Sequence, residues 1–207
     1  IRAGVLEWGT VELLRQAGAG ARMDREGQVH GGCYLANDGE MFRVDFKDIC
    51  GKQVMVYGQT EVTKDLYEAQ DVIGASIIHN AEDVTLHDVK SAKPRVTWIQ
   101  DGVAHELTCD FIAGCDGFHG VSRPSIPAEI RNEFEKVYPF GWLGVLSRTP
   151  PVEHELIYAS HARGFALCSM RNPMLSRYYI QVPMTDKVEN WSDEAFWAEL
   201  KNGLPAD

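Results

Sequence analysis

Hydrophobic and polar residues follow two different periods along the chain, and together these predict a mixed α/β fold. Apolar residues recur every three or four positions, as in amphipathic helices, in segments 5–17, 61–73 and 193–202, and more weakly in 128–137. Short apolar or alternating runs, which favour strands, occupy segments 29–30, 34–35, 42–46, 54–57, 76–79, 84–88, 95–100, 104–109, 111–114, 141–146, 156–159, 164–169 and 177–182. The C-terminal part of the chain is therefore expected to be rich in strands.

Boundary residues support several of these elements. Gly18 is a stop for the first helix, and Gly74 is a stop for the second, because glycine readily adopts the conformation that ends a helix. Thr60 is expected to cap the second helix and Ser192 the last one. Asp101-Gly102 predicts a tight hairpin, since a type I′ turn requires positive φ at both central residues.

Composition removes several classes of function. The 207 residues carry a formal net charge of −10, and an acidic surface is unsuited to nucleic-acid phosphates. No apolar run approaches the roughly 18 residues of a membrane span. Five cysteines without a CxxC spacing indicate neither a zinc site nor a disulfide framework. We therefore expect a cytoplasmic protein with reduced thiols, no metal and no membrane or nucleic-acid partner.

Glycines near residue 18 do not form a dinucleotide-binding motif. Gly18-Ala19-Gly20 begins a GxG, but Met23 occupies the place of the third glycine, and the segment follows a helix instead of a strand.

A better candidate is the run 111–123, in which an apolar segment leads into Asp116-Gly117. An aspartate at a strand end can accept from ligand hydroxyls, and glycine lets the backbone approach a ligand. A plain strand and turn would produce the same pattern.

Polar residues of segment 165–182 can lie together on one sheet face. Ser169 and Arg171 are two residues apart on one expected strand, and Arg177 and Tyr179 are two apart on the next. A guanidinium with hydroxyls beside it suits a carboxylate. The alternative is the exposed polar face of an antiparallel sheet.

Seven runs, which span nearly the whole chain, carry a resemblance: IRAGVLE (1–7), VYGQTEVT (56–63), AGCDGFHG (113–120), VYPFGWLG (137–144), ELIYA (155–159), RGFALCS (163–169) and SRYYIQVP (176–183). Together they resemble the flavin-dependent aromatic hydroxylases. The resemblance implies a partial form of that fold, in which an FAD lobe is interleaved with a substrate lobe built on a mixed or antiparallel sheet. The FAD lobe would comprise 1–29 and 55–136, and the substrate lobe 30–54 and 137–207.

The resemblance also implies an activity. FAD would be the cofactor, NADPH and O2 the co-substrates, and a flavin hydroperoxide would convert 4-hydroxybenzoate to 3,4-dihydroxybenzoate. The family's GxGxxG and its C-terminal part have no counterpart between Ile1 and Asp207, so we expect an internal piece of a longer protein. A homodimer is carried over from the family. A related hydroxylase of another hydroxylated benzoate, and a fragment that binds an aromatic acid without turnover, stay open.

Individual residues receive roles only through this resemblance. Tyr158 would hydrogen-bond the phenolic oxygen of the substrate, and His30 would end a proton relay to solvent. The residues that would bind substrate are Ser169, Arg171, Tyr179 and Tyr158. The residues that would contact FAD are Arg2, Gln59, Asp116, Gly117 and Arg177. The residues that would recruit NADPH are Arg2, His119 and Arg123.

Overall fold

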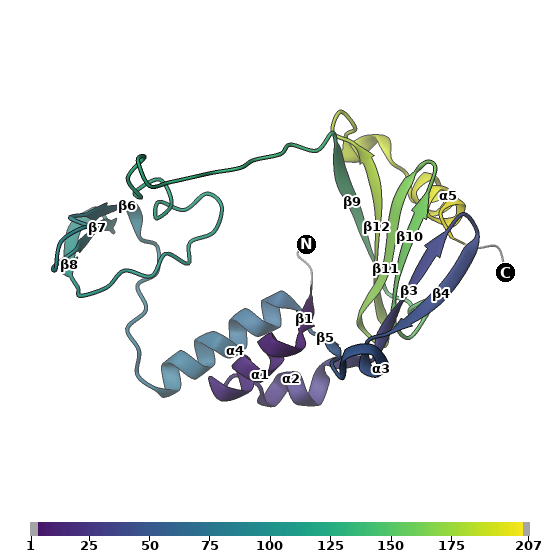
Figure 1. Cartoon of the computed structure of the whole chain (residues 1–207), viewed down its shortest axis with the longest axis horizontal. Helices are drawn as coiled ribbons and strands as arrows, with labels where there is room; N and C mark the ends of the chain where they lie inside the picture. The colour runs from purple at the N-terminus through teal and green to yellow at the C-terminus, as the bar shows by residue number, and fades with distance from the viewer. Residues whose placement is uncertain (1–3, 205–207) are drawn as a thin grey trace. The chain divides into compact units, whose positions relative to one another are not determined.

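The computed structural model describes residues 4–204, and these fall into two compact units. Among these residues, one unit contains 4–75 and 138–204, and the other contains Ser76–Val137. Helices and strands are mixed in the chain, as Figure 1 shows, so the predicted α/β class is confirmed. The assignment of an FAD lobe and a substrate lobe to particular ranges stays a prediction.

A small sheet and three helices form one part of the first unit. The sheet has the order β1 (Val5–Glu7), β5 (Val54–Val56), β2 (Gln28–His30), and all its strands are antiparallel. The helices are α1 (Trp8–Gln16), α2 (Ala21–Glu26) and α4 (Gln59–Val72). Their apolar sides meet the sheet in a core of buried side chains: Val11, Leu14, Ala19, Met23, Met55 and Tyr57.

A larger sheet of six strands forms the rest of this unit. Its order is β4 (Glu40–Asp45), β3 (Gly32–Asn37), β10 (Leu156–His161), β11 (Gly164–Asn172), β12 (Leu175–Pro183), β9 (Phe140–Ser147). Only the β3–β10 pair is parallel. Helix α5 (Asp193–Asn202) packs on one face, where Phe196 and Leu200 meet the apolar side chains of the central strands. The short helices α3 (Phe46–Cys50) and η1 (Val188–Asn190) lie in connections.

The second unit is built around a three-stranded antiparallel sheet of β6 (Glu82–His87), β7 (Arg95–Gln100) and β8 (Val103–Thr108). Asp101 and Gly102 have φ values of 52° and 76°, so the tight hairpin predicted between β7 and β8 is confirmed. Ser192 likewise caps α5, because its hydroxyl accepts from the Ala195 backbone N–H.

Several local expectations were wrong. Residues 5–7 form β1 instead of the first helical turn, because Val5 and Leu6 pair with Val56 and Met55. Helix α4 begins at Gln59, so Thr60 lies inside the helix instead of capping it. Residues 76–79 and 111–114 form no strand, and residues 128–137 form no helix. Apolar residues there, such as Phe111 and Phe134, are exposed, so no packing surface stabilises regular structure.

Candidate aromatic-acid and flavin site

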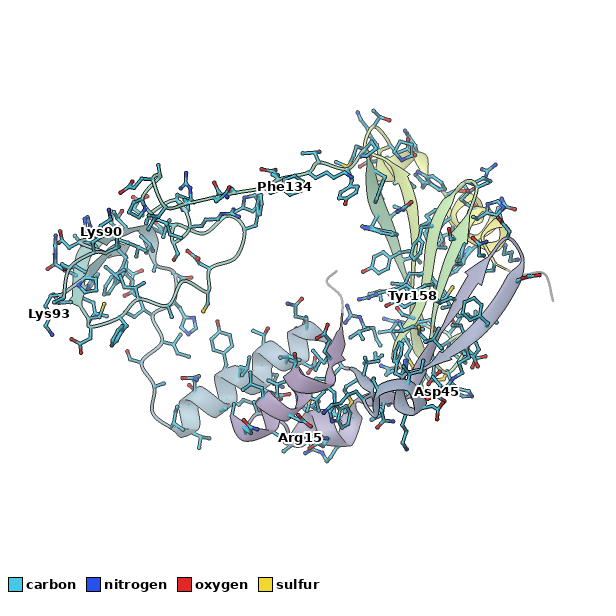
Figure 2. All side chains as sticks on the ribbon, viewed as in Figure 1. Arg15, Asp45, Lys90, Lys93, Phe134 and Tyr158 are labelled. Atoms are coloured by element: carbon cyan, nitrogen blue, oxygen red, sulfur yellow. The ribbon has the colours of Figure 1, made fainter. Side chains whose placement is uncertain are left out.

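Four of the predicted site residues share the face of the large sheet that α5 does not cover. Tyr158 is paired with Leu167, and Leu167 with Tyr179 on the next strand. Ser169 is paired with Arg177 in the same ladder. Directly paired residues lie on the same face, and alternate residues of one strand do too. Figure 2 labels Tyr158 on this sheet. The sheet therefore brings Tyr158, Ser169, Arg177 and Tyr179 together.

Aromatic rings surround these polar groups on the same face. Trp142 lies edge-on to Phe165 and Tyr179, with centroid distances of 5.7 and 6.4 Å. Phe165 also contacts Tyr158, at 6.2 Å between centroids. The Arg177 guanidinium lies 4.7 Å from the centre of the Tyr179 ring, within the range of a cation–π contact. The face thus offers flat apolar surface with a few polar groups, which suits an aromatic acid.

Electrostatics on this face favour an anion. Arg177 is buried, and burial together with the nearby charge of Arg171 lowers the pKa of its guanidinium. Two positive groups that raise each other's energy are stabilised by a carboxylate placed between or beside them. Burial raises the pKa of Tyr158, so its hydroxyl is protonated near neutral pH and can donate or accept a hydrogen bond. Ser169 uses its own hydroxyl to donate to the Arg177 carbonyl, at 3.0 Å.

Arg171 lies at the end of β11, where the strand pairing is irregular. The register shifts between Met170 and Asn172, so strand alternation alone does not decide on which side Arg171 lies. Arg171 lines a cavity of about 870 Å³ with Leu146, which is paired with Arg177 of this face, and with Gln59 at the start of α4. The backbone at Gly4 lies very close to Arg171 and to the Tyr57 carbonyl. A Cβ on Gly4 would collide with the Arg171 guanidinium and would lie 2.9 Å from the Tyr57 carbonyl oxygen.

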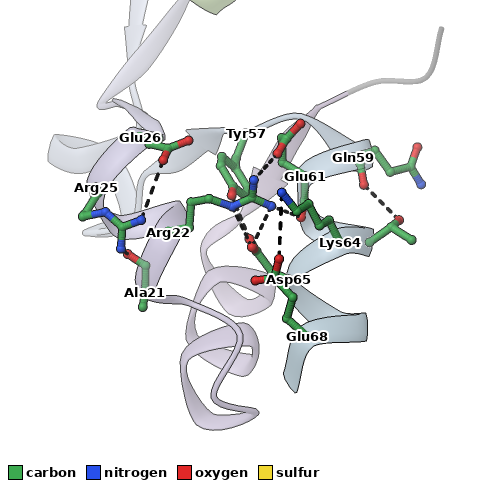
Figure 3. Close-up of polar contacts among 11 residues, drawn as sticks. Ala21, Arg22, Arg25, Glu26, Tyr57, Gln59, Glu61, Lys64, Asp65 and Glu68 are labelled. Atoms are coloured by element: carbon green, nitrogen blue, oxygen red, sulfur yellow. Dashed lines mark hydrogen bonds and ion pairs between the residues drawn. The ribbon is translucent and has the colours of Figure 1, made fainter. Parts of the chain in front are cut away.

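A partly buried polar cluster holds the start of α4 in place (Figure 3). The Tyr57 hydroxyl donates to Asp65 at 2.7 Å, and the Arg22 Nε donates to the other oxygen of Asp65 at 2.8 Å. Arg22 also pairs with the Glu61 carboxylate and donates to its backbone carbonyl at 3.0 Å. Sequence reasoning missed this cluster. Glu61 and Asp65 are one helical turn apart, but nothing in the sequence indicates that Arg22 would meet them.

His30 is buried at the end of β2 and lines a separate cavity of about 600 Å³ with Pro150, His154 and Met170. Burial lowers its pKa, although the nearby charge of Glu155 acts in the opposite direction. It is therefore neutral near pH 7 and able to accept a proton. Neither ring nitrogen has a hydrogen-bond partner among residues 4–204. The relay from Tyr158 to His30 stays a prediction.

A salt-bridged carboxylate joins the strand of Tyr158 to the segment after His30. Glu155, which precedes β10, accepts from the Gly32 backbone N–H at 2.9 Å and from Arg43 Nε at 2.6 Å. The hydrogen bond from Arg43 lowers the pKa of Glu155. This ion pair fixes β3 and β4 against β10 and is a second feature that the sequence did not reveal.

The remaining predicted residues lie in the second unit. Asp116 accepts from the Ser122 backbone N–H at 2.9 Å, and this bond lowers its pKa. Asp116, Gly117 and Arg123 line a cavity of about 730 Å³ within this unit. Arg123 lies over the Phe118 ring, and His119 packs edge-on to the same ring. Their cofactor roles stay predictions. Arg2 lies outside the described residues.

Comparison with known proteins identifies the family. A family model described as the FAD binding domain matches residues 1–207. The chain belongs to this FAD-binding family. It is 55% identical over 205 residues to the p-hydroxybenzoate hydroxylase of Acinetobacter baylyi, covering 99% of this chain and 50% of that protein. The chain thus spans about half the length of the curated relative that it matches. The predicted resemblance to flavin-dependent aromatic hydroxylases is confirmed.

Solved structures of the family's fold agree. The p-nitrophenol 4-monooxygenase of Pseudomonas putida superposes with a TM-score of 0.74 at 12% identity, covering 99% of this chain and 53% of that one. The flavin-dependent halogenase CmlS superposes with a TM-score of 0.72 at 16% identity, covering 98% of this chain and 39% of that one. These likenesses show the shared fold. In the part of the chain that the structure describes, no helix is long and apolar enough to cross a membrane.

The cavity at the start of α4 fits the flavin part of FAD. Its volume of about 870 Å³ lies within the usual range of ligand sites. Gly58 precedes α4, and no side chain caps the helix, while the N–H groups of Glu61 and Val62 donate to the Gly58 carbonyl. The N–H groups of Gln59 and Thr60 are left for a ligand at the cavity wall. Such groups and the Gln59 amide suit the polar edge of a flavin. Gly58 also lines the cavity, and the absence of a side chain there lets the backbone approach a flat ring.

Proposed function

We propose that the protein is an FAD-dependent hydroxylase that converts 4-hydroxybenzoate to 3,4-dihydroxybenzoate with NADPH and O2. The observation that carries the proposal is the grouping of Tyr158, Ser169, Arg177 and Tyr179 on one sheet face. The name of the Acinetobacter baylyi relative, at 55% identity, supports the substrate. Bound FAD supplies the chemistry that activates O2 for transfer to an aromatic ring.

Different residues of the site bind the two ends of the substrate. Arg171, with Ser169 and Tyr179, binds the substrate carboxylate, because guanidinium and hydroxyl donors match its two oxygens. To take part, Ser169 turns its hydroxyl proton from the Arg177 carbonyl to the carboxylate when the substrate binds. Binding at one end orients the ring so that a single carbon is presented for reaction. Tyr158 holds the phenolic oxygen at the other end. Tyr158 and Tyr179 lie on either side of Leu167, two strand spacings or about 10 Å apart, which leaves room for one aromatic ring.

Proton removal makes the substrate ring more reactive. A phenol with a pKa near 10 is mostly neutral at pH 7, and its phenolate is the better nucleophile. Tyr158 passes this proton towards His30, whose lowered pKa leaves it neutral and able to accept. Gln59, Arg177, Asp116 and Gly117 contact FAD, and His119 and Arg123 recruit NADPH. We further propose that residues 1–29 and 55–136 serve FAD, that 30–54 and 137–207 serve the substrate, and that the protein forms a homodimer.

The test is substrate binding by the complete product of the gene, loaded with FAD. Arg171→Ala should weaken 4-hydroxybenzoate binding by about 2–5 kcal/mol, the usual cost of removing one partner of a desolvated charge pair. Arg163→Ala is the matched control, since Arg163 is exposed and pairs with Glu199 at the surface. Unchanged affinity in Arg171→Ala, or hydroxylation of another benzoate isomer only, would contradict the proposal. Binding without any product would indicate a non-catalytic aromatic-acid protein.

A further inference from the structure

Gly144 lies directly opposite Tyr179 in the ladder between β9 and β12. Both residues belong to the open face of the sheet that carries Tyr158, Ser169 and Arg177. A Cβ built on Gly144 would lie 2.5 Å from Cε1 and 2.8 Å from Cδ1 of the Tyr179 ring. No side chain can occupy that space while the ring stays where it is. The Cδ1–Cε1 edge of the Tyr179 ring therefore lies directly against Gly144 of β9.

Backbone conformation does not explain this glycine. Gly144 is not among the glycines with positive φ, so alanine could adopt its extended backbone without strain. Glycine inside a strand is otherwise unfavourable, because it loses more conformational freedom on folding and contributes no side-chain packing. An aromatic ring packed against a glycine from the neighbouring strand offsets part of that cost. The close contact with Tyr179 is the reason that remains.

Other contacts fix the ring from the side. The Arg177 guanidinium lies 4.7 Å from the centre of the Tyr179 ring, and Trp142 meets it edge-on at 6.4 Å between centroids. With its neighbours in place, a ring displaced by a Cβ has to move away from the sheet. Restoring an ordinary contact of 3.4 Å requires a shift of about 1 Å, and such a misplacement can cost as much as a hundredfold in rate. That movement is into the space above the face.

We propose that Gly144 is a positioning residue that sets the height of the Tyr179 ring above the sheet, and with it the place of the Tyr179 hydroxyl at the carboxylate of an aromatic acid. This inference rests on the proposed function. Gly144 itself touches no substrate. It acts through Tyr179, and it keeps clear the space in which the substrate ring lies.

The test is a double-mutant cycle in the complete, FAD-loaded gene product, read by the dissociation constant of 4-hydroxybenzoate. Gly144→Ala should weaken binding about tenfold or more, because the shifted ring misplaces a hydroxyl and enters the site. In a Tyr179→Ala background the same change should alter affinity less than about twofold, because no ring remains to be displaced. Gly141→Ala is the control on the same strand, since a Cβ there would meet only the flexible Met184 Sδ, at 3.4 Å.

The midpoint of thermal unfolding shows whether Gly144→Ala weakens binding by destabilising the whole fold or by displacing the Tyr179 ring. Alanine should destabilise the protein at residue 144 only while Tyr179 is present. An equal loss of affinity in both backgrounds would overturn the inference, as would unchanged affinity in Gly144→Ala. If the unmutated protein does not bind 4-hydroxybenzoate at all, the proposed function fails, and this inference fails with it. If Gly144→Ala does not fold while the double variant does, steric conflict with Tyr179 is established directly.

Discussion

Replacing Tyr57 by phenylalanine removes one hydroxyl from the cluster that joins α2 to α4. We expect the free energy of unfolding to fall by about 1.5–3 kcal/mol, the usual contribution of a hydrogen bond to a charged group. The hydroxyl donates to Asp65 at 2.7 Å, and Asp65 is only 6% exposed, so solvent screens the interaction weakly. The loss should stay below the 3–5 kcal/mol of an uncompensated buried charge, because Arg22 still pairs with Asp65. The ring remains, so no cavity forms.

Urea unfolding at equilibrium measures this change, provided that the dependence on denaturant is equal for both proteins. Tyr34→Phe is the matched control. Tyr34 packs against the core of the large sheet, and its hydroxyl has no hydrogen-bond partner among residues 4–204. The control should change stability by less than about 0.5 kcal/mol. Equal losses in the two variants would refute the argument that Asp65 makes the Tyr57 hydroxyl special.

The pH dependence of the free energy of unfolding gives a second test of Tyr57→Phe. Burial, followed by the hydrogen bond to Asp65, raises the pKa of Tyr57 in the folded protein. Above about pH 10 the unfolded chain releases this proton and the folded chain retains it, so stability falls as the pH rises. Tyr57→Phe should lose less stability than the unmutated protein in this alkaline range. Parallel curves would show that Tyr57 titrates alike in both states.

Three further predictions concern the large sheet. The Arg43 hydrogen bond lowers the pKa of Glu155, so the ionised carboxylate stabilises the folded protein above about pH 4.5, and this stabilisation is lost as the pH falls. Unfolding curves of Glu155→Gln should therefore show lower stability than the unmutated protein at neutral pH and a smaller loss of stability on acidification. Phe196→Ala should cost about 3–5 kcal/mol in urea unfolding, whereas Phe134→Ala, at a 92% exposed site, should cost almost nothing. Tyr158→Phe should bind 4-hydroxybenzoate nearly normally but hydroxylate it slowly in single-turnover assays; normal turnover would remove Tyr158 from the mechanism.

Local chemistry in the sequence predicted several features correctly. The Asp101-Gly102 hairpin and the Ser192 cap depend on residues within one turn of each other, so neighbouring residues alone specify them. The shared face of Arg177 and Tyr179 follows in the same way from the twofold alternation of a strand. The resemblance predicted the family, which the comparisons confirmed.

Pairing between distant segments decided the features that the sequence left open or led us to predict wrongly. The spacing of apolar residues from Val5 onward fits a helix, but a ladder with β5, about fifty residues away, converts the first three into a strand. Likewise, the register shift after Met170 interrupts the alternation at Arg171, and the register of β9 brings Gly144 opposite Tyr179.

The sequence by itself thus determined the elements whose signals are short-range: turns, caps, alternation and the family's motifs. Only the tertiary structure decided which faces meet, because burial and strand register depend on partners that lie far along the chain. The pairing of Asp65 with Arg22 and the close approach of Gly144 to Tyr179 are of this second kind. Each is a contact between segments more than thirty residues apart, and periodicity along one segment carries no information about its partner.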